Sequence, residues 1–128
     1  MADYTAKRID DMVGTFGGAF KLARAELGVT SFGMQILELP PNLTEGYPNH
    51  DHAETGQEEV FLALRGSGTM TIDGEAVELT PDVMVRVGPG ARRSLVTGPE
   101  GLRMLALGGV PGSAYEINPQ TELSAAAS

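Results

Sequence analysis

The feature that most constrains the fold is the regular alternation of short apolar runs and turn signals in the second half of the chain. The breaks are rich in glycine and proline, of which the chain has 17 and 8. One break, Asp73-Gly74, is the dipeptide most typical of a two-residue hairpin turn. The runs expected to form strands lie at 59–64, 69–72, 75–79, 83–87, 91–96 and 102–107. Short strands with a turn signal about every 8–12 residues predict an all-β barrel or sandwich.

The first forty residues carry two kinds of pattern. Residues 20–27 and 32–39 have the composition of two further strands. Before them, four apolar side chains recur with the i, i+3, i+4, i+7 spacing of one helix face: Ile9, Met12, Val13 and Phe16. Gly17-Gly18 would end such a helix. We therefore expect one short N-terminal helix packed on the barrel.

Length, charge and cysteine content narrow the class of protein. A chain of 128 residues predicts a single domain. We expect an arm with the helix and first strand at 1–30, the barrel at 31–110 and a tail at 111–128. The net charge of −8 repels phosphate, so neither nucleic acid nor a membrane surface is an expected partner. The absence of cysteine excludes disulfides and thiolate metal sites, and no signal peptide is visible. Both observations fit a cytoplasmic protein.

The two histidines of the chain, His50 and His52, stand two residues apart. On an extended strand, side chains at i and i+2 lie on the same face, so both imidazoles can reach one metal ion. Glu59 is the candidate third ligand, because it would face His52 across an antiparallel pair with Cβ atoms about 5 Å apart. Glu58 would then point outward. Two histidines and one carboxylate with open positions form the donor set of non-haem Fe(II) oxygenases.

These residues resemble the cupin superfamily, in particular its small single-domain barrels of the cupin_2 type. Five residues stand in the order of the first cupin motif: Gly46, His50, His52, Glu59 and Gly66. Residues 81–93 are similar to the second motif. The resemblance spans 32–107 and implies a double-stranded β-helix, a jelly-roll-like barrel. It also implies a metal ion in the barrel mouth of many members, and a homodimer as the common assembly.

Two positions depart from the cupin pattern. Six residues separate His52 from Glu59, so the connecting loop is longer than usual in the family. Arg93 stands where the second motif has its histidine. Arg93 could pair with Glu59 and fill the metal site with an ion pair. Alternatively, a metal lies on the two histidines and Glu59, while Arg93 binds a substrate carboxylate or phosphate through two hydrogen bonds.

The first function hypothesis is a small metalloenzyme of the oxygenase or isomerase type. It would hold a divalent transition metal such as Fe, Mn, Ni or Zn and act on a small, anionic organic molecule. The expected substrate-binding residues are Arg93, Phe61, which shares the inward parity of Glu59, and Gln57, which flanks the site. The alternative is a metal-free barrel that binds or senses a small molecule, with Glu59 and Arg93 paired.

Overall fold

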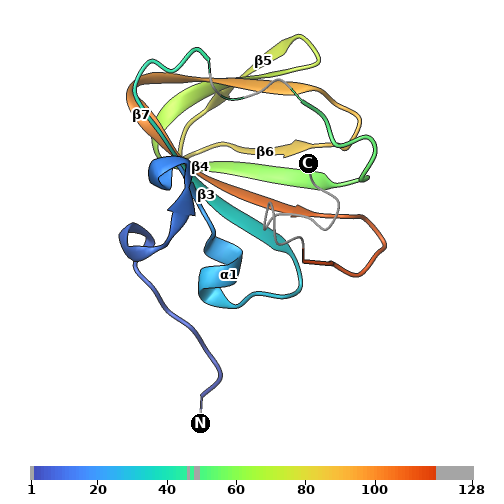
Figure 1. Cartoon of the computed structure of the whole chain (residues 1–128). Helices are drawn as coiled ribbons and strands as arrows, with labels where there is room; N and C mark the ends of the chain where they lie inside the picture. Colours follow the sequence, from blue (N-terminus) through green and yellow to red (C-terminus); the bar gives the residue numbers. More distant parts are fainter. Residues whose placement is uncertain (1, 46, 48–49, 118–128) are drawn as a thin grey trace.

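The computed structural model describes residues 2–45, 47 and 50–117. Its elements are η1 (Ile9–Asp11), β1 (Gly14–Thr15), η2 (Phe16–Gly18), β2 (Phe20–Lys21), α1 (Ala23–Leu27), β3 (Gly33–Leu39), β4 (Glu58–Ile72), β5 (Glu75–Leu79), β6 (Met84–Val87) and β7 (Arg93–Gly109). Here η marks a short 3-10 turn. Within these ranges no helix has the length and apolar character needed to cross a membrane. The protein is mostly antiparallel β-structure, as the sequence predicts (Figure 1).

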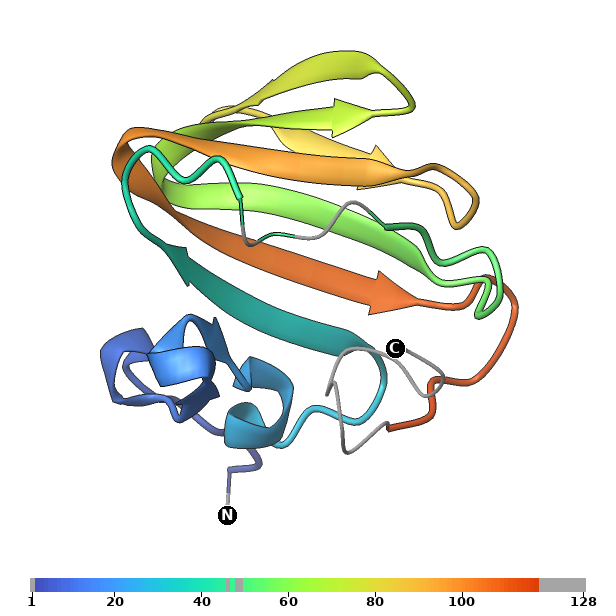
Figure 2. The ribbon, with the colours of Figure 1, turned by 45° about the horizontal axis from the view of Figure 1, so that its top comes forward.

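One antiparallel sheet runs in the order β1-β2-β3-β7-β4-β5. β6 pairs with the first part of β4, on the edge opposite β7, and β5 pairs with the same edge further along β4. The two longest strands, β4 and β7, pair with each other along most of their length. Figure 2 shows both strands bending over at the same end of the molecule, so that the sheet folds into two layers. Each long strand therefore contributes to both layers of the barrel.

The bend is built into β4 and β7 where the sequence predicts turns. The β4–β7 register shifts between Ala63 and Arg65 and again between Gly66 and Gly68, which marks bulges in the ladder. Gly66 has a φ of 79°, and a Cβ there would lie 2.1 Å from the carbonyl oxygen of Gly101. Only glycine allows this close approach. The expected breaks at 65–68 and 97–101 are thus bends inside single strands, and the four predicted runs around them merge into two.

The space between the layers is filled by aliphatic and methionine side chains. The largest fully buried apolar residues are Phe61, Met70, Leu79, Met104 and Val87. They belong to one core cluster, and phenylalanine contributes a single buried ring to it. The aromatic-poor sequence, with four Phe and no Trp, leaves soft methionine to fill the remaining gaps.

The prediction of a helix over residues 9–16 is wrong. In its place the chain forms η1 and the first strand of a short β1–β2 hairpin, in which Gly14 pairs with Lys21. Phe16, the last member of the expected apolar face, has a φ of 53° and is exposed. A helix cannot continue through that conformation. The arm nevertheless packs on the sheet, because Met12 is buried.

The helix of the protein lies instead within the segment expected to be a strand. Only Phe20 and Lys21 of that segment are extended, and α1 follows directly. The residues of α1, Ala-Arg-Ala-Glu-Leu, are strong helix formers without β-branching. Gly28 ends the helix in the left-handed conformation, with its N–H donating to the carbonyl of Arg24. Ala23 and Ile36 bury the contact between α1 and β3.

Candidate metal centre

The His50–His52 segment is fixed to the start of β7 by backbone hydrogen bonds. His50 and Arg93 exchange two of them, at 3.0 and 2.8 Å, and the N–H of His52 donates to the carbonyl of Pro89 at 2.8 Å. Glu59, in contrast, has its two backbone neighbours in β6 and β7. The expectation that the histidine segment and the Glu59 strand are paired neighbours is therefore wrong. The side chains meet across the barrel mouth instead of along one ladder.

The three expected metal ligands do come together. One ligand atom from each of His50, His52 and Glu59 lies within 4.8 Å of the other two. His52 Nε2 is 3.3 Å from Glu59 Oε1, and both side chains are buried. The two imidazole rings stand nearly perpendicular, with centroids 5.1 Å apart. Two neutral imidazoles and a carboxylate are donors that Fe, Mn, Ni and Zn accept in proteins.

Neighbouring charged side chains point away from this group. Glu58 forms an ion pair with Arg86 on the outer face, as strand alternation predicts. Asp51, between the two histidines, accepts a hydrogen bond from the N–H of Ala53 and lies 3.5 Å from Arg92. Neither carboxylate belongs to the group that His50, His52 and Glu59 form among the described residues.

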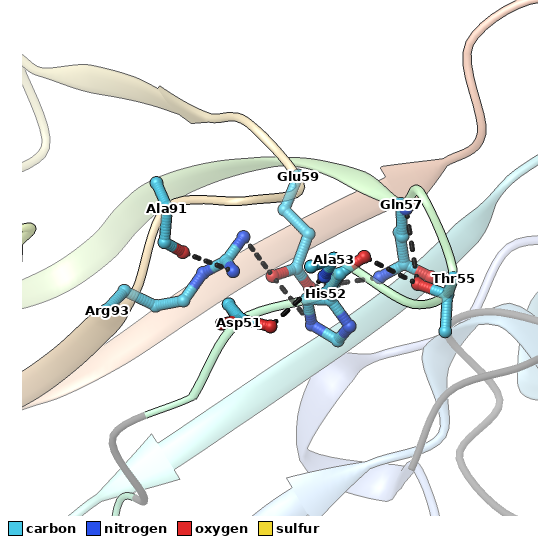
Figure 3. Close-up of polar contacts among 8 residues, drawn as sticks. All are labelled: Asp51, His52, Ala53, Thr55, Gln57, Glu59, Ala91 and Arg93. Carbon is cyan, nitrogen blue, oxygen red and sulfur yellow. Dashed lines mark hydrogen bonds and ion pairs between the residues drawn. The ribbon is translucent and has the colours of Figure 1, made fainter.

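Arg93 has no exposed surface and enters the site from the first residue of β7. Its Nη1 donates to the carbonyl of Ala91 at 2.9 Å, and its Nη2 lies 3.2 Å from Glu59 Oε1 (Figure 3). Its Nε and Nη2 donate no hydrogen bond to any described residue. Glu59 Oε1 likewise accepts none from the described part of the chain. Buried groups of this kind are rare and mark places that await a partner.

Phe61 and Gln57 are both buried beside Glu59. Phe61, two residues along β4 on the same inward parity, belongs to the core cluster beneath the ligands. Gln57 has no exposed surface, and its Nε2 donates to Glu59 Oε2 at 3.2 Å. That either residue contacts a substrate stays a prediction.

Tyr47 is a site residue that the sequence reasoning missed. Its ring lies 5.6 Å from the His50 ring, centroid to centroid. Burial and the negative charge of Glu59 raise the pKa of the Tyr47 phenol well above its usual value, although the cation of Arg93 opposes this. The phenol therefore stays protonated and can donate a hydrogen bond. The available signal was an aromatic side chain between Gly46 and His50 in an otherwise polar loop; Gly46 itself lies outside the described residues.

The donor set fits a divalent ion, provided that the net positive charge of the occupied site is compensated. Glu59 and Arg93 bring one negative and one positive charge, which cancel when both are ionised. A divalent ion bound by the two neutral histidines and Glu59 would leave a net charge of +2 in a buried site. Uncompensated buried charge is strongly unfavourable. The site therefore fits a metal ion best when an anion occupies the space between the ion and Arg93.

Comparisons with known proteins agree with this architecture. No protein-family model matches the sequence. A cupin protein from Bacteroides fragilis superposes with a TM-score of 0.69 at 24% identity, covering 94% of this chain and 95% of that one. A sugar phosphate isomerase of the cupin superfamily from Silicibacter pomeroyi superposes with a TM-score of 0.64 at 17% identity, over 81% of this chain and 74% of that one.

One curated relative is similar in sequence. Dimethylsulfoniopropionate lyase DddW of Ruegeria pomeroyi is 35% identical over 77 residues, which are 60% of this chain. The match spans 43% of the lyase, less than half of its length. The structural likenesses establish the folded barrel, and the two motif regions supply its mouth. The chain therefore has the cupin fold.

Proposed function

We propose that this protein is a metal-dependent cupin that acts on a small anionic organic molecule. His50, His52 and Glu59 would hold a divalent transition metal such as Fe, Mn, Ni or Zn. Arg93 would bind the carboxylate or phosphate of the substrate. The observation that carries the proposal is the meeting of three metal donors and a fully buried guanidinium, whose Nε and Nη2 donate no hydrogen bond to any described residue.

The charge balance explains why the ligand should be an anion. A monoanion between the metal and Arg93 would lower the net charge of the site from +2 to +1, and a dianion would neutralise it. The guanidinium presents its donors in a planar fork that matches two oxygens of a carboxylate or phosphate. Because Arg93 is fully buried, this hydrogen bonding would be little screened by solvent.

Each residue of the site has a separate task in this proposal. The metal would supply Lewis acidity and open coordination positions, which suit either oxygenase-type or isomerase-type chemistry. Arg93 would orient the substrate by its charged end. Tyr47, kept protonated, would donate a hydrogen bond from the side of His50. Phe61 would form the apolar floor that excludes water.

The named activities of similar proteins are compatible with a small molecule that carries an anionic group. One structural neighbour is named as a sugar phosphate isomerase, and the curated relative is named as a dimethylsulfoniopropionate lyase. Both names describe small molecules with a phosphate or carboxylate group. Because cupins share a fold across many chemistries, the reaction has to be established on this chain itself.

The second candidate is a metal-free barrel that binds or senses a small molecule. The 3.2 Å contact between Arg93 Nη2 and Glu59 Oε1 favours it, because the guanidinium then takes the place of the cation. In that case the N–H groups of Arg93 that do not point at Glu59 would hold the ligand. No redox or Lewis-acid chemistry would follow.

The metal content of untagged protein separates the two candidates. We expect about one transition-metal ion per chain in the wild type, measured by plasma mass spectrometry after reconstitution and desalting, and none in a His50→Ala/His52→Ala variant. Asp51→Asn is the matched control, since Asp51 lies between the histidines and pairs with Arg92 outside the site. It should bind metal like the wild type. A wild type without metal after reconstitution would leave the metal-free barrel.

A further inference from the structure

Gln57 is a fully buried polar side chain whose amide has a single hydrogen-bond partner among the described residues. Its Nε2 donates to Glu59 Oε2 at 3.2 Å, and its Oε1 accepts no hydrogen bond from the described residues. The opposite orientation of the amide would place two acceptor oxygens against each other at this distance. The carboxylate of Glu59 therefore selects the orientation, and the amide in turn restrains the carboxylate (Figure 3).

The backbone on the far side of the amide is shaped to admit it. Gly108 of β7 is the register partner of Glu59 on β4. A Cβ on Gly108 would lie 2.9 Å from Gln57 Nε2 and 3.1 Å from its Cδ. Any side chain at this position would push the amide away from Glu59. The glycine thus provides the space that the contact between Gln57 and Glu59 requires.

The loop that carries Gln57 is tied to His52 by local hydrogen bonds. The carbonyl of His52 accepts from the N–H of Gly56 at 2.8 Å and from the hydroxyl of Thr55 at 3.2 Å. The N–H of Gln57 donates to the same Thr55 hydroxyl at 3.2 Å. The enlarged loop between the second histidine and the glutamate is therefore an ordered connection, with Thr55 linking one ligand to the residue that holds the other.

The two carboxylate oxygens of Glu59 therefore have different partners. Oε2 is held by Gln57, while Oε1 faces His52 and Arg93 at 3.3 and 3.2 Å. We infer that Gln57 is a positioning residue that fixes the rotamer of Glu59, so that Oε1 alone is presented to the metal. Its action on the metal rests on the proposed function. Its action on Glu59 does not, because the hydrogen bond exists without a metal.

The metal-dependent part is tested with Co²⁺ as the probe. Gln57→Leu removes the donor at similar volume, and we expect its Co²⁺ affinity to fall at least 10-fold, with a changed visible absorption spectrum of the bound ion. Gly108→Ala should weaken Co²⁺ binding in the same direction while keeping Gln57. Thr97→Val is the matched control: Thr97 is buried and hydrogen-bonded to Pro40 and Leu43, away from the site. It should lower thermal stability without changing the spectrum.

The metal-independent part is tested on metal-free protein with a double-mutant cycle. We expect the fall in thermal midpoint caused by Gln57→Leu to be at least twofold smaller in a Glu59→Met background, where the acceptor is absent. Equal falls in both backgrounds, or an unchanged Co²⁺ spectrum and affinity in Gln57→Leu, would overturn the inference. A wild type that binds no Co²⁺ but shows the coupling would refute the proposed function and uphold the role of Gln57 towards Glu59.

Discussion

Two arginines on β7, Arg103 and Arg93, differ in how many hydrogen bonds their guanidinium groups donate. Arg103, which lies on the outer face and is mostly buried there, donates to both oxygens of Glu38 and to Asp10 of the N-terminal arm. Arg93 is more deeply buried, yet two of its nitrogens donate to none of the described residues. The outer arginine pairs with two carboxylates and links β3 to the N-terminal arm. The inner one keeps unused donors, which is expected of a residue that binds something outside the chain.

The pKa values of Arg103 and Asp10 reflect the hydrogen bonds between them and Glu38. The hydrogen bonds that Arg103 donates to Glu38 and Asp10 raise the pKa of Arg103 above its usual value, although partial burial opposes this. Arg103 in turn lowers the pKa of Asp10, first through the hydrogen bond and then through its charge. In such a network each charge has a partner, and its role is structural. Around Arg93, in contrast, two of the three guanidinium nitrogens donate no hydrogen bond to any described residue.

The largest effect should come from removing the one carboxylate that faces Arg93. Glu59→Ala leaves a buried guanidinium without a counter-charge, and we expect the unfolding free energy of metal-free protein to fall by about 3–5 kcal/mol. Urea denaturation measures it. The matched variant Glu38→Ala should cost about 1 kcal/mol or less, because Arg103 is nearer to solvent and retains Asp10. Equal losses in the two variants would remove the contrast between the arginines.

An intermediate effect should appear when the inner cation itself is removed. In the wild type, acetate or phosphate should tighten Co²⁺ binding about 10-fold, or about 1.4 kcal/mol, by compensating the excess positive charge. Arg93→Met should bind Co²⁺ at least as well without added anion and should lose this anion effect. Titration calorimetry with and without the anion measures both. Arg86→Met, on the outer face, should keep the anion effect; if Arg93→Met keeps it too, Arg93 does not bind the anion.

The smallest effect should come from Asp10, which is exposed. The hydrogen bond from Arg103 holds the pKa of Asp10 in the folded protein below its usual value, so the folded state binds the proton less tightly than the unfolded state. The stabilisation is therefore complete above about pH 3.8 and is lost as the pH falls through the lower, folded value. The difference in thermal midpoint between wild type and Asp10→Asn should be small and constant near neutral pH and vanish in acid. A difference that grows in acid would contradict the assignment.

The sequence predicted the hairpin and the site better than the bends. The Asp73-Gly74 turn follows from local turn chemistry and the strand expected at 32–39 from its composition; both are present, the strand as Gly33–Leu39. The bend at Gly66 is different, because glycine is equally compatible with a turn between strands and a bulge within one. Which of these forms depends on the partner strand, here on the approach of Gly101. That information is not local.

The same distinction applies to the site. His50, His52 and Glu59 could be selected because two histidines at i, i+2 and a carboxylate are chemically conspicuous. The structure changes how they meet: the histidine segment is bonded to β7, not to the strand of Glu59. Tyr47 was not selected, because an aromatic residue in a polar loop is a weak signal and its relevance depends on a ring contact with His50 that only the structure shows.

β7 reaches the site with both of its ends. Its first residue, Arg93, lies beside Glu59 Oε1, and its penultimate residue, Gly108, makes room for the amide that holds Oε2. The two ends of β7 therefore lie against the same carboxylate, and the bend at 97–101 lies between them. A single inserted or deleted residue in this bend would shift one end of β7 relative to the other. Gly101 is fixed as well, because its φ is 78° and a Cβ there would lie 2.8 Å from the carbonyl oxygen of Leu39. In related barrels, we therefore expect the length of this segment to vary little.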